Sequence, residues 1–148
     1  MADDEREIRR LLARFANSFD LKAWDALADC LAESLRTDYS DLRGSPPETL
    51  SRDRFVELRR TALDRLKTHH LAGNQEIAVQ GDRARCRTSM IIWRRDEDGR
   101  VLNTHCLYDL EVARAGDGWR IASITQKVLW SDGDPTIHAG IGAPSRTK

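Results

Sequence analysis

An acidic residue and two neighbouring histidines are the side chains of this sequence best suited to proton chemistry. Asp20 stands at the expected end of a first helix, and His69 and His70 open a first long strand. Histidine exchanges protons near neutral pH, and a carboxylate beside it can orient the ring. Adjacent strand residues point to opposite faces, so only one histidine can face the core and the two cannot share a metal ion. An exposed or helix-capping carboxylate explains Asp20 equally well.

Tyrosines and a third histidine add hydrogen-bonding groups. Tyr39 lies on a short extended segment; its hydroxyl could donate to a substrate oxygen, although strand tyrosines often serve only packing. His105 and Tyr108 have opposite parity on a later strand, so without a bulge only one of them faces inward. The expected pocket is apolar and aromatic, suits a small hydrophobic cyclic or aromatic substrate, and is lined by Phe19, Trp24, Phe55, Met90, His105 and Tyr108.

Motifs for metals, phosphates and activated serines are missing from the sequence. It contains no HxH, HExxH or paired Cys/His spacing, no glycine-rich phosphate loop and no GxSxG element. The three cysteines, Cys30, Cys86 and Cys106, form no CxxC pair and indicate buried free thiols in a reducing compartment. The sequence therefore predicts neither a metal site nor a cofactor.

Charge and length limit the function classes. The 148 residues fit one domain, and 24 basic residues balance 24 acidic ones. A zero net charge argues against a broadly basic nucleic-acid binder, so a solvated strand face is the expected position of Arg83, Arg85, Arg87, Arg94 and Arg95. The start of the chain is charged from the third residue, and no apolar run reaches the length of a signal peptide or a membrane span. We expect a cytoplasmic protein with no membrane partner.

Helical periodicity dominates the first half of the chain. Apolar residues at helical spacing predict helices over residues 4–18 and 21–33, and Ser51 is the expected N-cap of a third helix that ends near Lys67. The Gly44–Pro47 segment breaks regular structure between them.

From His69 the period changes to that of strands. Turn signals at Gly81-Asp82, 96–99 and 115–118 separate alternating segments, the last of which runs from Trp119 to about Trp130. Three helices followed by a meander predict an α+β fold, in which the helices cover one face of a curved, mostly antiparallel sheet and enclose a pocket in a cone-shaped barrel. Residues 1–130 form the expected domain, and residues 131–148, rich in Gly, Pro and small polar residues, an irregular tail.

The stretches ANSFDLKAWDALADCLAESLRTDYSD, THHLAGNQEI, GDRARC and LYDLEVARAGDGWRI resemble the SnoaL-like branch of the nuclear transport factor 2-like superfamily. The resemblance covers roughly residues 5–130 and is closest to scytalone dehydratase and its bacterial relatives. It implies the cone-shaped fold. It also implies that Asp20 pairs with His70 and that Tyr39 is the tyrosine of the family's short extended segment.

The sequence departs from scytalone dehydratase at other pocket positions. Phe19 replaces a second tyrosine, the region of a second histidine reads Ile92-Trp93-Arg94, and the pocket asparagine falls near Tyr108. Ile124 is nearest to an arginine that the related dehydrochlorinase carries on its last strand. The sequence thus retains the Asp20–His70 dyad but not the residues by which the family recognises its substrate.

A cofactor-independent lyase of dehydratase type is the leading hypothesis. His70 would take a proton from a carbon beside a carbonyl, Asp20 would orient the ring, and Tyr39 would stabilise the enolate oxygen. Isomerisation or polyketide cyclisation by the same dyad is one alternative. A non-catalytic small-molecule-binding protein and a dioxygenase small-subunit-like partner of a larger complex are the others.

Apolar side chains on the outer sheet face predict self-association. If Met90, Ile92 and Tyr108 face inward, then Ile91, Trp93 and Leu107 face outward. Such a face needs a cover, so we expect a homo-oligomer, a dimer or a trimer.

Overall fold

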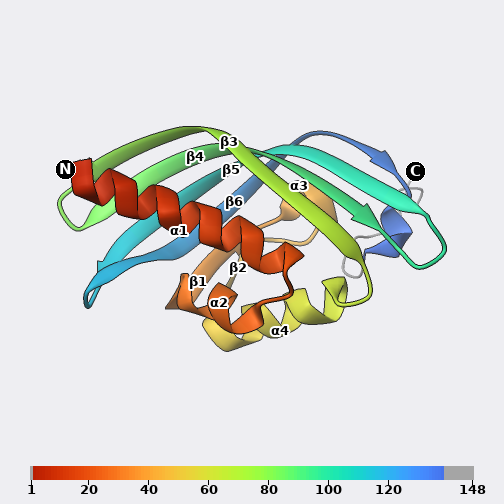
Figure 1. The fold of residues 1–148 in the computed structure, drawn as a ribbon, viewed down its shortest axis with the longest axis horizontal. Helices are drawn as coiled ribbons and strands as arrows, with labels where there is room; N and C mark the ends of the chain where they lie inside the picture. The colour runs from red at the N-terminus through yellow and green to blue at the C-terminus, as the bar shows by residue number, and fades with distance from the viewer. Residues whose placement is uncertain (1, 139–148) are drawn as a thin grey trace.

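One curved six-stranded sheet carries the second half of the chain and part of the first (Figure 1). The computed structural model describes residues 2–138, and the expected tail from residue 139 onward lies outside them. The elements are α1 (Ala2–Asp20), α2 (Trp24–Asp29), β1 (Leu31–Asp38), α3 (Ser40–Arg43), β2 (Glu48–Ser51), α4 (Arg52–Leu63), β3 (Lys67–Gln80), β4 (Arg83–Arg95), β5 (Val101–Ala115), β6 (Gly118–Gly133) and a 3-10 helix (Pro135–Ile137).

The sheet is antiparallel except at one junction. Its order is β2-β1-β6-β5-β4-β3, and only β1 and β6 run parallel. Strands β3 to β6 form the predicted meander, with turns at all three predicted places. The α+β prediction is confirmed, with the difference that the sheet curves without closing into a barrel. None of the helices within residues 2–138 combines the length and the apolar character of a membrane span.

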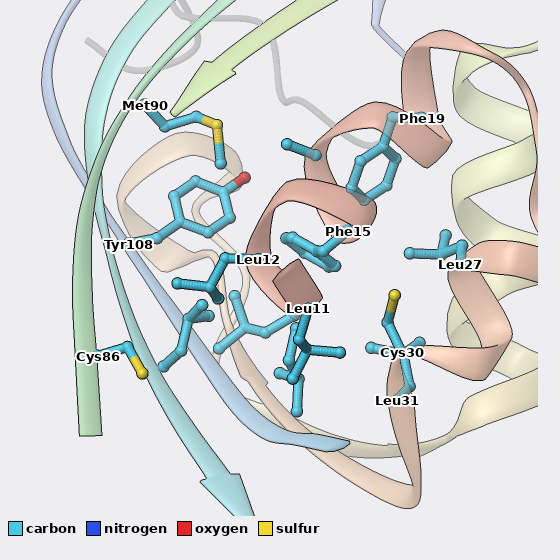
Figure 2. Packing of buried hydrophobic residues seen from close by; sticks show 14 of the residues in the cluster. Leu11, Leu12, Phe15, Phe19, Leu27, Cys30, Leu31, Cys86, Met90 and Tyr108 are labelled. Atoms are coloured by element: carbon cyan, nitrogen blue, oxygen red, sulfur yellow. The ribbon is translucent and has the colours of Figure 1, made fainter. Parts of the chain in front are cut away.

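Helix α1 lies across one face of the sheet and supplies most of the core from the helical side (Figure 1). Its apolar residues recur at the predicted helical spacing, and their side chains are almost completely buried: Ile8, Leu11, Leu12, Phe15 and Phe19. Figure 2 shows Phe15 and Leu12 of α1 turned toward Tyr108 of β5 and Met90 of β4, with Leu27, Cys30 and Leu31 on the other side. This packing fixes the end of α1 against the sheet.

The predicted helix over residues 21–33 is confirmed only for residues 24–29. α2 ends at Asp29, and Leu31 begins β1. The backbone of Ile121 in β6 donates to the carbonyl of Cys30, so strand pairing with a segment about 90 residues away overrides the local helical spacing. The turn before α2 is made by Lys22, whose φ of 55° is left-handed and whose Nζ donates to the carbonyls of Leu63 and Leu66 at 2.7 Å each.

Two other boundaries differ from prediction. Ser51 caps α4 as expected, accepting a hydrogen bond from the Arg54 backbone N–H at 3.1 Å, but the helix ends at Leu63 and not near Lys67. β6 continues to Gly133, and the 3-10 helix follows it, so residues 131–137 are largely regular where an irregular tail was expected. The last described residue, His138, is buried.

The three cysteines are free and buried, as predicted. Burial raises the pKa of each thiol to about 11. Cys106 also accepts a hydrogen bond from Gln126 Nε2 at 3.6 Å, which connects β5 to β6 on the inner face of the sheet.

Candidate functional site

The last residue of α1 binds the first residues of β3. Asp20 Oδ1 lies 2.7 Å from His70 Nδ1 and accepts a hydrogen bond from Thr68 Oγ1 at 2.9 Å. Asp20 Oδ2 accepts the backbone N–H of His70 at 2.7 Å. His70 is 7% exposed, whereas His69 is exposed on the outer face. The structure therefore brings Asp20 and His70 together and settles which histidine faces inward.

Aromatic packing fixes the plane of the His70 ring. Phe19 stacks on it with ring centroids 4.8 Å apart, and Phe15 meets Phe19 edge to face at 5.1 Å. Because Phe19 and Asp20 are consecutive on α1, one helix end holds both the face and the edge of the imidazole. The ring is thus preorganised by two different kinds of contact.

The charge states of the pair follow from burial and hydrogen bonding. Burial raises the pKa of Asp20, but the hydrogen bonds from the His70 ring, the His70 backbone and Thr68 lower the pKa below its ordinary value. Burial lowers the pKa of His70 and outweighs the attraction of Asp20, which acts in the opposite direction. At neutral pH the carboxylate is charged and the ring is neutral. An ionised Asp20 can only accept, so Nδ1 carries the proton and Nε2 keeps a free lone pair.

A small cavity adjoins the pair. Its volume is about 20 Å³, room for about one water molecule. Four of the predicted site residues line it, namely Phe19, Tyr39, His70 and Tyr108. The two tyrosine rings meet edge to face with centroids 6.3 Å apart, and Gln126 Nε2 donates to the Tyr108 oxygen at 3.4 Å. Burial raises the pKa of Tyr108 well above its usual value, so its hydroxyl stays protonated.

Four predicted pocket residues do not line the cavity, and their assignment to it was wrong. Trp24 is on the periphery and donates to Asp64 Oδ1 at 3.2 Å. Phe55 is fully buried under the Arg59 guanidinium, 4.5 Å from its ring centroid. Met90 is buried further along β4, beside Tyr108 (Figure 2). His105 lies on the outer face and stacks on Trp130 at 4.2 Å.

Polar residues that the sequence reasoning missed complete the lining: Arg43, Arg59, Arg94, Gln126 and His138. Arg94 was expected on a solvated face, and that prediction is wrong, because Arg94 is 4% exposed. The alternation of the strand could have predicted this burial, because Arg94 is two residues from the inward-facing Ile92 and points to the same face. Arg59 shares a face of α4 with buried Phe55 and Leu63, four residues to either side. The other four arginines of β4 are exposed as predicted, namely Arg83, Arg85, Arg87 and Arg95.

Metal-ligating side chains do not gather at this site. Across residues 2–138, no group of three or more His, Cys, Asp or Glu side chains is placed to hold an ion. The titratable and charged side chains at the cavity are His70 with its partner Asp20, Tyr39, Tyr108, His138 and the three arginines.

The chain belongs to the SnoaL-like domain family, which matches residues 1–125. A scytalone dehydratase-like protein, claB, of Passalora fulva is 27% identical over 103 residues, which are 70% of this chain and 56% of the relative. The chain thus spans about half the length of that relative.

Solved structures of similar proteins give the fold. The Kfla4162 protein of Kribbella flavida superposes with a TM-score of 0.87 at 24% identity, over 92% of this chain and 97% of that one. The hexachlorocyclohexane dehydrochlorinase LinA-type3 of Novosphingobium barchaimii has a TM-score of 0.77 at 13% identity, over 93% and 94% of the two chains. The predicted resemblance to SnoaL-like proteins of scytalone dehydratase type is confirmed, and solved structures of nuclear transport factor 2-like proteins share the fold.

Proposed function

We propose that this protein is a cofactor-independent lyase of dehydratase type, in which His70 is the general base. The observation that carries the proposal is the 2.7 Å contact between the buried ring of His70 and an ionised Asp20 at the edge of a cavity. A neutral ring with a free Nε2 is the form that can accept a proton. The family, with members named as dehydratase-like, favours the same reaction type.

The reaction begins with proton transfer to Nε2 of His70 from a carbon beside a carbonyl group. The electron pair of the broken C–H bond forms an enolate, and Asp20 stabilises the imidazolium. Tyr39 and Tyr108 line the cavity, and their hydroxyls are the phenol donors available for the enolate oxygen. Collapse of the enolate expels a hydroxyl group from the neighbouring carbon. The proton on Nε2 passes to this group, so water leaves and His70 returns to its neutral form.

Hydrogen–deuterium exchange tests whether the site removes a carbon-bound proton. Proton NMR in D₂O of small ketones and hydroxyketones, cyclohexanone among them, would follow loss of the α-proton signal with wild-type protein and with His70→Gln. We expect wild type alone to accelerate exchange, because only a lone pair at Nε2 of an imidazole accepts the proton. Equal rates for both proteins across the panel would favour a non-catalytic binding protein.

Isomerisation and cyclisation are the second candidate function, since the dyad makes the same enolate in each. Exchange without loss of water from a hydroxyketone would favour them. Phe19 and Tyr108 stand where scytalone dehydratase has other pocket residues. These differences argue against scytalone as the substrate, but they do not bear on the type of reaction.

We also propose a homo-oligomer, a dimer or a trimer, formed through the outer face of the sheet. Trp93 is 38% exposed and Trp130 54%, and each stacks on a histidine of a neighbouring strand, His69 and His105 respectively. Leu71 on β3 is 53% exposed beside them. Burying these side chains would remove a large apolar patch from water.

Light scattering measures the assembly directly. We expect a mass that is a multiple of the 16.8 kDa chain at micromolar concentration. Trp93→Glu should shift the mass toward one chain, because a charge would be placed in the apolar contact. Arg10→Glu, at an exposed position of α1 on the opposite side of the sheet, is the control and should leave the mass unchanged. A wild-type mass of one chain would reject the proposal.

A further inference from the structure

Three arginine side chains converge on the cavity from three separate elements. Arg43 comes from α3, Arg59 from α4 and Arg94 from β4. Arg59 is 5% exposed and Arg94 4%, while Arg43 is half-buried. In the sheet register Ile92 of β4 is paired with His70, and Arg94 is paired with Thr68. Arg94 is therefore the next inward-facing residue of β4 after the one beside His70.

None of these guanidiniums forms an ion pair with a carboxylate of residues 2–138. Arg94 donates from Nη1 to Thr104 Oγ1 at 2.8 Å and to the carbonyl of Leu102 at 3.5 Å, both neutral acceptors. The guanidiniums of Arg43 and Arg59 each lie 4.7 Å from the centroid of the Tyr39 ring. Asp20, the carboxylate of the dyad, is already engaged by Thr68 and His70.

Donor and acceptor capacity at the cavity is left unused. Within the described part of the chain, Nε of Arg43, Nε of Arg94 and Oε1 of Gln126 are buried without a hydrogen-bond partner. Taking a charge out of water without a counter-charge is costly, and unused buried donors add to the cost. Burial lowers the pKa of Arg43 and of Arg94 to about 10, because the charged form is disfavoured away from water. An oxyanion would supply the missing charge together with the acceptors that Nε of Arg43 and Nε of Arg94 lack.

We propose that the cavity binds the carboxylate of a small cyclic or aromatic acid, with Arg94 as its main partner and Arg59 and Arg43 as further donors. The inference rests on the proposed function for the step at His70 and adds the class of substrate. A carboxylate held by a guanidinium is neutralised, so the carbon beside it loses a proton more readily. The cavity holds about one water molecule in this structure, so binding of the acid requires the lining side chains to move apart.

Matched pairs of an acid and its neutral amide test the charge requirement without any turnover. Titration calorimetry with benzoate and benzamide, and with cyclohexanecarboxylate and its amide, measures affinity for each member of a pair. We expect each acid to bind at least about 10-fold more tightly than its amide, since charge-assisted bonds to arginine need the anion. Equal affinities within both pairs, or no measurable binding of either acid, would overturn the proposal.

Variants assign the preference to Arg94. Arg94→Met should reduce the affinity for benzoate to that for benzamide, and Arg95→Met, on the exposed face of the same strand, should leave it unchanged. Removing an unpaired buried charge should leave the thermal midpoint unchanged or raise it. Retained benzoate preference in Arg94→Met would overturn the assignment. Should that variant fail to fold, Arg59→Met must lower the preference for benzoate, or the proposal fails.

A His70→Gln variant separates this inference from the proposed function. We expect it to lose deuterium exchange and to keep the preference for benzoate over benzamide. If wild type prefers benzoate but catalyses no exchange, the anion site stands and the lyase proposal fails. If wild type catalyses exchange but binds acid and amide equally, the lyase proposal stands and the anion site fails.

Discussion

Asp20→Asn is expected to lower the rate of proton abstraction by roughly 10²–10⁴-fold, the range that general-base catalysis supplies. An asparagine amide can donate to Nδ1 of His70, which would move the ring proton to Nε2 and occupy the lone pair that accepts the substrate proton. The measurement is the α-proton exchange rate on the most reactive ketone, with circular dichroism to show that the fold is kept. Asp117→Asn, the same change at an exposed turn, is the control. Unchanged rates in Asp20→Asn would make the pair structural.

The pH profile gives the same prediction a second readout. Because burial lowers the pKa of His70, the neutral, reactive form persists below pH 6.5, the ordinary value. We expect the wild-type rate to rise with pH along an acidic limb centred below 6.5 and to be constant around neutrality. Asp20 acts to raise the pKa of His70, so its loss should move the limb to still lower pH. A limb centred above 6.5 would contradict the assignment of His70 as the base.

Phe15→Ala is expected to produce the largest loss of stability, about 3–5 kcal/mol, the usual cost of truncating a buried phenylalanine. Phe15 is 1% exposed and contacts both Phe19, at 5.1 Å between ring centroids, and Tyr108, at 6.4 Å. The variant should therefore also loosen the ring that stacks on His70. Urea unfolding measures the free energy. Leu21→Ala, at a residue 75% exposed, is the control and should change it by no more than about 0.5 kcal/mol.

A loss below about 1 kcal/mol in Phe15→Ala would show that the core can close around the missing ring. Domains of this kind are stable by about 5–15 kcal/mol, so the variant remains foldable at low temperature and the free energy stays measurable.

Local periodicity predicted those parts of the fold that neighbouring residues control. The helical spacing of Ile8, Leu12 and Phe15 gave α1, and strand alternation gave β4 with Met90 and Ile92 facing inward. The same alternation required that only one of His69 and His70 face the core. The pairing of His70 with Asp20, 50 residues away, came from family resemblance and not from spacing.

Long-range pairing decided what local patterns could not. Leu31 has the spacing of a helix with Leu27, yet it belongs to β1, because β6 offers a parallel partner more than 80 residues later. The pocket prediction failed for a related reason: Arg94 was expected on a solvated strand face, and Arg59 was not considered as a site residue. Strand and helix periodicity put both side chains on inward faces, but their convergence depends on α4 and β4 meeting around Tyr39, which no local pattern encodes.

The three buried thiols make the folded chain its own reporter of opening. With a pKa of about 11, roughly one thiol in 10⁴ is ionised at pH 7, so maleimide or aromatic disulfide reagents react with them only when they become solvated. Cys106 sits behind Gln126 at the cavity, whereas Cys30 closes the end of α2. Labelling kinetics resolved by mass spectrometry would thus separate breathing at the cavity from breathing at the helical end. No residue would have to be added or removed to read either motion.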